Sequence, residues 1–253
     1  MELSELILKV LTYNLLRYLV IAGIAFLIYY VLFKKRWNYK KIQNSLPKQK
    51  DYWREFVYSM VTITIFVGVA ITIFGTPLAA YTLRYDEVDQ YGTAYWVLSI
   101  LLMIFLHDTY FYWMHRAMHS PLIFKHIHKV HHLSTNPSPW AAYAFHPLEA
   151  VFEASIIYLI VFSIPYHQSA LFAFLAFMII YNVYGHLGFE LYPRGFNRTW
   201  IGKWVNTSVN HNQHHKLFHG NYGLYFLFWD RWLGTIREDY DSEFAEADRK
   251  RAN

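Results

Sequence analysis

Histidine is concentrated in three short stretches of this chain. The first two lie in HRAMHSPLIFKHIHKVHH at residues 115–132, and the third is HNQHH at residues 211–215. Four positions separate His115 from His119, so on a helix the two rings share one face. The other two stretches repeat the spacing HxxHH, with ring nitrogens offered by His128, His131, His132, His211, His214 and His215.

Eight clustered imidazoles are more than one metal ion needs. Imidazole nitrogen binds iron, zinc, copper and nickel, and a tetrahedral zinc site uses only four ligands. We therefore predict two metal ions held mainly by neutral nitrogen. A single histidine is more often a packed or surface residue, but three clusters with repeated spacing favour metal. His186, in NVYGHLGFE at the end of an apolar stretch, is a ninth candidate, with a helix-capping residue as the alternative.

The remaining five histidines are weaker candidates. Three are set aside, namely His107, His126 and His167. The first is about 12 Å deeper than His115 along the same predicted helix, the second is out of register, and the third falls in a turn at the opposite membrane face. Two stay undecided between a ligand, a neighbour of a ligand and a surface residue: His146 and His219.

Acidic residues near the histidines are candidates for orienting the ligands or taking part in the chemistry. They are Asp108, Glu149, Glu153 and Glu190. A ligating imidazole usually donates its second N–H to a carboxylate or a carbonyl. Asp108 lies inside an apolar span, where an ionised group is costly and is treated as functional. A direct carboxylate ligand is the competing role. For Glu149 and Glu153, four positions apart, the alternative is a pair on a polar helix face.

The composition identifies the elements that must position these groups. Of 253 residues, 55% are hydrophobic, 20% aromatic and 16% charged, and none is cysteine. The absence of cysteine excludes disulfides, thiolate metal sites, iron–sulfur clusters and a cysteine nucleophile. Pro165 separates two apolar stretches and predicts a tight hairpin. Stretches long enough to cross a bilayer lie near 10–33, 56–75, 94–113, 148–164 and 168–188.

Loop charge predicts the orientation in the membrane. The first loop carries Lys34, Lys35, Arg36, Lys40, Lys41, Lys48, Lys50 and Arg54. The second carries three acidic residues against one Arg84. By the positive-inside rule the first loop is cytoplasmic, and the same orientation brings all histidine clusters to the cytoplasmic face. The net charge of +5 therefore sets topology, and no nucleic-acid partner is expected. A bacterial inner membrane and the endoplasmic reticulum fit equally.

We expect an all-α integral membrane protein with four to five transmembrane helices and a cytosolic histidine-rich cap that holds a dimetal site. The single domain 1–253 divides into an anchor helix at 1–33, a catalytic core at 94–236 and a solvated tail at 237–253. The first segment has no Ala-x-Ala-like cleavage site, which favours a retained anchor. The chain has no Glu-x-x-His pair, HExxH, GxGxxG, Walker loop or CxxCH, so any electrons come from another protein.

In this order, HRAMH, HKVHH and HNQHH resemble the boxes of the fatty acid hydroxylase and sterol desaturase superfamily of membrane non-haem di-iron enzymes. YFYWMHR, FHPLE at 145–149 and NYGLYFLFWDRWLGT at 221–235 are similar too. The resemblance covers roughly residues 34–236. It implies two irons and metal ligands at His115, His119, His128, His131, His132, His186, His211, His214 and His215. Some members have a further histidine near the His186 position, so a tenth ligand stays open among Glu190, His219, water and none.

The expected reaction is the O2-dependent hydroxylation or desaturation of a lipid C–H bond. Acid and base groups cannot break such a bond at neutral pH, so a metal-based oxidant is required. The expected cofactor is two iron ions, with zinc an alternative in purified samples. The expected partners are a membrane lipid, O2 and a separate electron donor of the cytochrome b5, ferredoxin or reductase type. Sterol, fatty acyl, sphingoid and carotenoid substrates stay open.

Two other functions compete with this one. A membrane metal-binding or transport protein without oxygenase activity predicts polar groups throughout the bilayer. A haem-binding electron carrier predicts paired histidines at similar depth within the membrane. Neither fits HxxHH boxes gathered on one side.

The aromatic run 110–113 fits an interfacial belt, with a lipid slot as the alternative.

Overall fold

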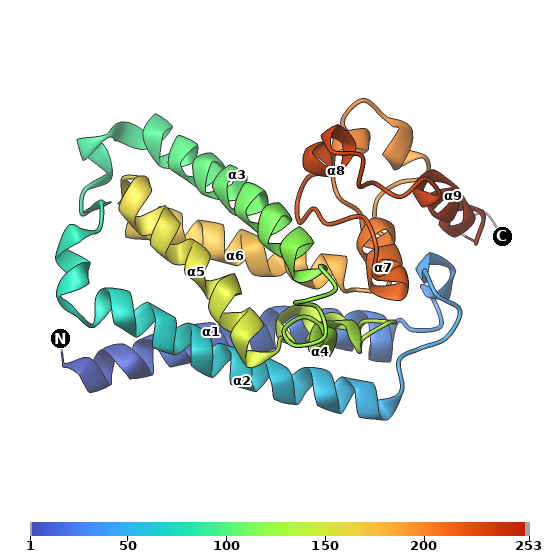
Figure 1. Cartoon of the computed structure of the whole chain (residues 1–253), viewed down its shortest axis with the longest axis horizontal. Helices are drawn as coiled ribbons and strands as arrows, with labels where there is room; N and C mark the ends of the chain where they lie inside the picture. The colour runs from blue at the N-terminus through green and yellow to red at the C-terminus, as the bar shows by residue number, and fades with distance from the viewer. Residues whose placement is uncertain (1, 251–253) are drawn as a thin grey trace.

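The protein is a bundle of long helices with a cap of short helices at one end (Figure 1). The computed structural model describes residues 2–250. The long helices are α1 (Leu3–Phe26, continued by a π-helical segment Leu27–Leu32), α2 (Gln49–Phe74), α3 (Gly92–Met118), α5 (Pro147–Ser163) and α6 (Gln168–Gly185). The short ones are α4 (Lys129–His132), α7 (Ser208–Leu217), α8 (Phe228–Trp232) and α9 (Tyr240–Lys250).

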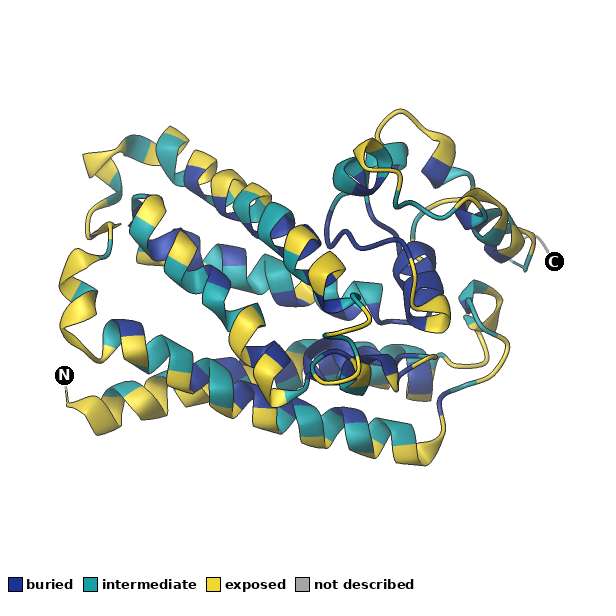
Figure 2. Cartoon of the chain, viewed as in Figure 1, coloured by how far each residue is buried: buried dark blue, intermediate teal, exposed yellow. Residues whose placement is uncertain are grey.

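Four of the long helices have the length and hydropathy of membrane spans: α1 with its continuation, α2, α3 and α6. Helix α5 has 17 residues, which by helical rise gives about 26 Å, less than the roughly 30 Å of a bilayer core. The chain is thus a multi-pass all-α membrane protein, as predicted. Large apolar side chains face outward from these helices, among them Leu8, 64% exposed, and Phe105, 55% exposed. The outer sides of the helices are accordingly exposed in Figure 2.

The predicted hairpin joins α5 to α6 at the end of the bundle away from the cap. The turn contains the two-residue strand β2 (Tyr166–His167), which pairs in parallel with β1 (Arg84–Tyr85) from the loop after α2. His167 caps α6 there by accepting a hydrogen bond from the Ser169 N–H. The acidic loop and the hairpin turn therefore lie together at one end of the bundle.

The basic first loop lies at the other end, against the cap. The Ile42 N–H donates to the Gly188 carbonyl, and the Gln43 amide donates to Asn212 Oδ1 at 2.9 Å. Because Asn212 belongs to α7, the first loop contacts the helix that carries the third histidine box. The predicted placement of the histidine clusters on the same side as the basic loop is confirmed.

The C-terminal stretch differs from the predicted solvated tail. Residues 240–250 form α9, whose Tyr240, Phe244 and Ala247 are buried. These three residues are spaced three and four positions apart, so they form one apolar face that packs with Val209 of α7. Charged residues separate these three along the chain, and the prediction of a solvated tail was based on that charge. Residues 251–253 lie outside the described part of the chain.

Candidate metal centre

All nine predicted ligands come together between the ends of α3 and α6 and the helices α4 and α7. His115 lies in the last turn of α3 and His119 follows its end, while His186 follows the end of α6. The two HxxHH boxes lie on short helices. His128 immediately precedes α4, which contains the rest of its box, and the third histidine stretch lies within α7. Helix ends thus direct the rings of residues far apart in sequence to one place.

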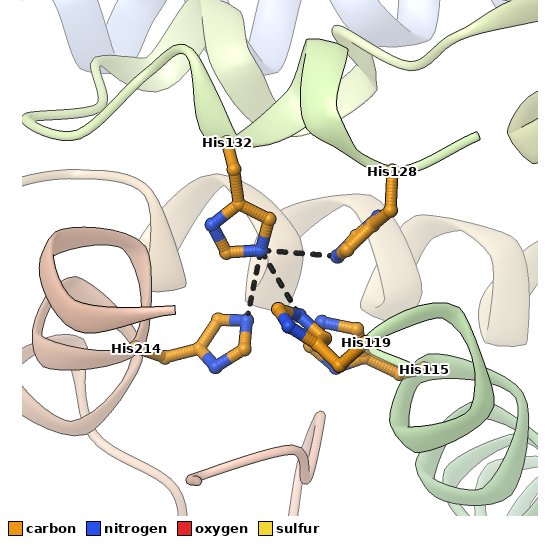
Figure 3. Close-up of side chains that lie close together, drawn as sticks. All are labelled: His115, His119, His128, His132 and His214. Atoms are coloured by element: carbon orange, nitrogen blue, oxygen red, sulfur yellow. Dashed lines mark hydrogen bonds between the residues drawn. The ribbon is translucent and has the colours of Figure 1, made fainter. Parts of the chain in front are cut away.

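The nine histidines form two groups, and in each group one nitrogen from every ring lies within 4.8 Å of those of the others. The larger group (Figure 3) is His115, His119, His128, His132 and His214. The smaller group is His131, His186, His211 and His215. Each HxxHH box contributes to both groups. In each box the residues at i and i+4 share a helix face and enter one group, whereas the residue at i+3 enters the other.

Within each group the Nε2 atoms converge. His132 Nε2 lies 3.1 Å from His119 Nε2, 3.0 Å from His128 Nε2 and 3.1 Å from His214 Nε2, as Figure 3 shows. The two groups are themselves adjacent, since the His132 and His215 rings stack with centroids 4.8 Å apart. The arrangement is that of two neighbouring nitrogen sites.

The smaller group repeats this pattern around His186. Its Nε2 lies 3.1 Å from His211 Nε2, 3.1 Å from His215 Nε2 and 3.3 Å from His131 Nε2. Four imidazoles from three segments of the chain therefore point at one another. This is the ligand number of a closed tetrahedral site and enough for an iron site with room for further ligands.

In five of the nine rings the opposite nitrogen, Nδ1, is fixed by an acceptor. Nδ1 of His115 donates to the Tyr222 carbonyl at 2.9 Å, and Nδ1 of His186 donates to the Asn182 carbonyl at 2.8 Å. A carbonyl only accepts, so in each case the ring proton is on Nδ1. The same holds for His214, with the Gly220 carbonyl, and His215, with the Ser134 carbonyl.

This proton placement tests whether the residues fit a metal. A neutral imidazole with its proton on Nδ1 carries a lone pair on Nε2. The inward-facing Nε2 atoms of His186 and His215 therefore bring two lone pairs to within 3.1 Å of each other. A cation placed between converging lone pairs turns this repulsion into attraction. The donor set thus fits a metal ion in each group, with carbonyls as the outer partners that metal-bound histidines normally have.

Electrostatics keep the ligands neutral and available. Burial, followed by repulsion from the neighbouring rings, lowers the pKa of His128, His131 and His132 well below its ordinary value of 6.5. Burial lowers the pKa of His186 to about 4. Metal ions bind neutral imidazole, so at neutral pH no proton has to be removed first.

Among the acidic candidates, Glu149 hydrogen-bonds to one of the nine clustered histidines. Its Oε1 accepts a hydrogen bond from Nδ1 of His128 at 2.6 Å, and both side chains are buried. This carboxylate–imidazole pair matches the outer partner that the sequence predicted. Glu153, one turn further along α5, faces the bundle interior instead and lines a cavity.

Two other acidic candidates have different partners from those expected. Oδ1 of Asp108 accepts from the backbone N–H groups of Tyr225 and Phe226 at 2.7 and 3.1 Å, so it anchors the loop after α7. Glu190 accepts from the Tyr184 hydroxyl and from the N–H of Val209 in the first turn of α7. Each carboxylate accepts hydrogen bonds from backbone N–H groups that folding brings to it from distant segments. Spacing along the chain does not predict such contacts. For Asp108 the expected hydrogen bond to an imidazole is corrected, since Oδ1 accepts from backbone N–H groups and Oδ2 has no partner in residues 2–250.

The five remaining histidines lie outside both groups, as far as residues 2–250 show. His107 is buried with Nδ1 2.9 Å from the Tyr225 hydroxyl, and His146 caps α5 by accepting from the Leu148 N–H. The side chains of His126 and His219 are exposed. No tenth ligand from Glu190 or His219 joins the groups in this part of the chain.

Asp230 is a structural residue of the site that the sequence reasoning did not single out. Oδ1 accepts from the Tyr222 N–H and Oδ2 from the Gly223 N–H, at 2.9 and 2.7 Å. These bonds hold the loop whose carbonyls accept from His115 and His214. The sequence feature that could have identified Asp230 is its place in FWDRW, where a single aspartate lies in an aromatic run.

An apolar cavity of about 620 Å³ opens beneath the metal centre, between α1, α2, α3, α5 and α6. Phe111 and Phe145 line it and also contact the ligands. The Phe111 ring lies 4.9 Å from the His115 ring, and the Phe145 ring lies 5.0 Å from the His131 ring, measured between centroids. The cavity therefore reaches both groups. Of the aromatic run 110–113, Phe111 lines the cavity whereas Trp113 is 48% exposed, so members of the run lie in different surroundings.

The fold and the site together define a multi-pass helical membrane protein with a double histidine cage above an apolar cavity. A family model described as fatty acid hydroxylase matches residues 100–235, more than half of the chain and all but the first helices and the end. The chain belongs to the fatty acid hydroxylase family, as the histidine boxes predicted.

Curated relatives carry sterol-related names. A lathosterol oxidase of Rattus norvegicus is 29% identical over 186 residues, which are 73% of this chain and 60% of that protein. A Delta(7)-sterol 5(6)-desaturase of Gibberella zeae is 29% identical over 218 residues, 84% of this chain and 63% of that protein. One of Leptosphaeria maculans is 30% identical over 192 residues, 75% of this chain and 51% of that protein. The chain spans less than two thirds of each. No solved structure matches.

Proposed function

We propose that this protein is a membrane oxidoreductase that hydroxylates or desaturates a lipid with O2, two iron ions and electrons from a separate protein. The observation that carries the proposal is the pair of adjacent histidine groups at the end of an apolar cavity. The names of the family and of the relatives support a lipid substrate, and the relatives favour a sterol.

One iron would be held by the five-histidine group and the other by the four-histidine group. Bound there, the irons would supply the oxidising power, derived from O2, that an unactivated C–H bond requires. The protein's own part is to keep nine imidazoles neutral, fixed and close together. For five of them, Glu149 and backbone carbonyls accept the Nδ1 proton, which also makes Nε2 a stronger donor to metal.

The substrate would lie in the cavity, with one carbon near the Phe111 and Phe145 rings. These side chains are apolar, so they exclude water from the space between the lipid and the ligands while leaving room for a C–H bond. A cavity of about 620 Å³ falls within the usual range for a bound small molecule, roughly 300–1,000 Å³. Such a lipid would come from the bilayer that surrounds the helices.

We place the metal centre on the cytoplasmic side. The basic first loop packs beside α7, and short loops rich in lysine and arginine are cytoplasmic by the positive-inside rule. An electron donor of the cytochrome b5, ferredoxin or reductase type would meet the protein on this side. The catalytic core is then the segment 94–236, with 1–33 as an anchor helix. A metal transporter is less well supported, because both groups lie at one end of the bundle.

Metal analysis of protein purified without oxygen tests this function. We expect about two irons per chain and O2 consumption that depends on an added sterol or fatty acyl lipid and a reductase. Zinc also binds imidazole, so iron must be supplied during expression. His131→Ala and His214→Ala should each lose metal from a different group, whereas the exposed His126→Ala should not. Full metal content in the first two variants would refute the ligand set.

A further inference from the structure

One tyrosine ring lies against the histidines of the metal centre. Tyr222 contacts three members of the five-histidine group, with centroid distances of 5.7 Å to His115, 5.2 Å to His119 and 5.7 Å to His214. In residues 2–250 no other tyrosine or tryptophan ring contacts the nine histidines. The other aromatic contacts are phenylalanines, which resist one-electron oxidation: Phe111, Phe124, Phe145 and Phe218. A phenol is far easier to oxidise, so Tyr222 is the ring through which an electron can pass.

A continuous row of tyrosine and tryptophan rings leads from Tyr222 to the surface. Tyr112 of α3 lies 6.4 Å from Tyr222, and it stacks on Trp229 of α8 at 6.0 Å, measured between centroids. Trp229 lies 5.7 Å from Trp232, which is 66% exposed. These separations fall within the roughly 4.5–7 Å of aromatic rings in contact. We call Tyr222, Tyr112, Trp229 and Trp232 the aromatic relay.

The aromatic relay is held in place and has one side branch. Trp229 Nε1 donates to Thr109 Oγ1 of α3 at 3.3 Å, which joins α8 to the end of α3. Trp113 contacts Tyr112 at 5.5 Å and Trp229 at 5.8 Å, but in the described part of the chain its ring does not contact Trp232. An electron that enters at Trp232 therefore reaches Tyr112 through Trp229, and Trp113 is a second connection to the surface.

Tyr112 has a path for its proton, which an interfacial belt of aromatic residues does not require. Its hydroxyl lies 2.8 Å from Thr235 Oγ1, which itself donates to Asp230 Oδ1 at 2.7 Å. Since the Thr235 proton is directed at the carboxylate, Tyr112 is the donor in its bond to Thr235. Arg116 Nη1 donates to the Tyr112 oxygen at 3.2 Å, so this oxygen stays hydrogen-bonded when its proton leaves. Tyr112 is fully buried, and the two side chains replace water as the proton acceptor.

We propose that the aromatic relay carries oxidising equivalents away from the metal centre when no lipid in the cavity uses them. The inference rests on the proposed function, because these equivalents come from O2 at the two irons. A centre that can oxidise a C–H bond also oxidises its own surroundings when the cavity is empty. The nearest side chains in the cavity are Phe111 and Phe145, whose rings contact the ligands. The aromatic relay thus protects them and the histidines.

Each transfer moves one electron inward and returns the relay to its starting state. Tyr112 loses an electron through the Tyr222 ring, and the metal centre is reduced by that electron. The phenolic proton of Tyr112 passes to Thr235 Oγ1, while Thr235 gives its own proton to Asp230. The tryptophans of the relay then return an electron to Tyr112 as the proton moves back. A thiol in solution supplies the electron to the exposed tryptophan, and two thiols oxidised in this way join as a disulfide with the release of two protons.

Light-driven oxidation of the metal-free protein tests the aromatic relay apart from turnover. Leu233→Cys, beside Trp232 and 38% exposed, gives a single attachment site for a ruthenium photosensitiser, because the chain contains no cysteine. With a cobalt(III) ammine complex as an irreversible acceptor, a flash leaves oxidised ruthenium, which takes an electron from the relay. Electron paramagnetic resonance should then show a neutral tyrosyl radical, and Tyr112→Phe should abolish it. An equal signal in Tyr112→Phe would overturn the proposal.

Matched variants keep the test decisive. Tyr240→Phe should keep the signal, because Tyr240 is buried beside a threonine hydroxyl as Tyr112 is but lies in α9, outside the relay. Trp229→Phe should lose most of the signal, whereas Trp113→Phe, on the side branch, should keep it. Thr235→Val leaves every ring in place, so the signal should fall about tenfold or more, since a positioned proton acceptor contributes roughly 10²–10⁴-fold. Equal signals in Trp229→Phe and Trp113→Phe would contradict the route.

The aromatic relay and the proposed function fail in different ways. Iron binding and lipid-dependent O2 consumption without a light-driven radical at Tyr112 would leave the oxidoreductase standing and refute the relay. With iron and O2 but no lipid, Tyr112→Phe should accumulate more oxidised Phe111 than the wild type by mass spectrometry, and equal oxidation would refute the protective role. A light-driven radical in protein that binds no iron and consumes no O2 would refute the proposed function, and the protective role with it.

Discussion

At the scale of single residues, the site depends on which nitrogen of each ring carries the proton. Nine of the 14 histidines in the sequence form the two groups, but an imidazole can present either nitrogen. Carbonyl oxygens of Tyr222, Asn182 and Ser134 and the carboxylate of Glu149 select Nδ1 as the donor, which turns Nε2 inward. The acceptors are thus as much a part of the metal centre as the rings.

Glu149→Gln tests the one carboxylate among these acceptors. The glutamine oxygen can still accept from His128 but carries no charge, so His128 becomes a weaker ligand. We expect metal affinity at the five-histidine group to fall about tenfold to a hundredfold, the usual effect of losing an outer partner. The measurement is iron retention against a graded chelator. Glu87→Gln, exposed at the opposite end of the bundle, is the control, and equal retention in both variants would contradict the role of Glu149.

The depressed pKa values of the ligands predict how the metal-free protein responds to acid. In the unfolded chain a histidine binds a proton near pH 6.5, whereas folded His186 does so only near pH 4 because it is buried. The unfolded state therefore binds more protons between these values, and stability falls as the pH is lowered from about 6.5 to 4. Thermal unfolding of chelator-treated protein across this range measures it. A melting temperature that stays constant or rises on acidification would contradict the prediction.

At the scale of elements, short helices and tight loops do the positioning. Helix α7 places His214 and His215 toward different groups, and the loop after it returns carbonyl oxygens to their neighbours. That loop reverses at Phe218, Gly220 and Asn221, which all have positive φ. Asp230 then fixes the next residues. The loop is therefore a rigid outer layer of the metal centre.

Gly220→Ala tests the tight fit of this loop. A Cβ at Gly220 would lie 2.7 Å from the Thr235 carbonyl oxygen, closer than real Cβ contacts. Gly234→Ala is the matched control, since its φ of +64° is similar to the +75° of Gly220 but nothing lies within 4 Å. Both variants incur the cost of a left-handed alanine, about 1–2 kcal/mol. Only Gly220→Ala should show a larger loss of unfolding free energy together with lower metal retention. Equal losses would refute the clash.

The features that could be predicted from the sequence are those that depend on the spacing of residues along a short stretch of the chain. The hairpin at Pro165, the spans and the meeting of the histidines in one place follow from apolar runs, loop charge and HxxHH. What could not be predicted depends on contacts between distant segments. The partners of Asp108 and Glu190 are backbone N–H groups or hydroxyls brought there by folding. Helix α9 was missed because its apolar stripe has only three members.

At the scale of the whole molecule, the structure separates three regions along the axis of the bundle. The end near the N-terminus holds the acidic loop and the hairpin turn, and the other end holds the histidine groups and the basic loop (Figure 1). The apolar cavity runs between them, with Arg84 and Tyr166 lining it at the first end and Phe111 and Phe145 at the second. Under the proposed function, a lipid in the bilayer and a water-soluble electron donor would approach the same ligands from opposite directions. A cytoplasmic electron donor would reach the histidine groups only if that end of the bundle faces the cytoplasm.

Single-cysteine labelling tests that orientation, and the chain suits it because it contains no cysteine. Lys34→Cys lies in the exposed basic loop next to the cap, and Glu87→Cys lies in the exposed acidic loop at the other end. The positive-inside rule puts Lys34 in the cytoplasm, so in intact bacteria that carry the protein in the inner membrane a membrane-impermeant maleimide should label only Glu87→Cys. Inside-out vesicles should give the reverse pattern. Labelling of Lys34→Cys in intact cells would place the metal centre away from the cytoplasmic electron donors and would refute the proposed route for electrons.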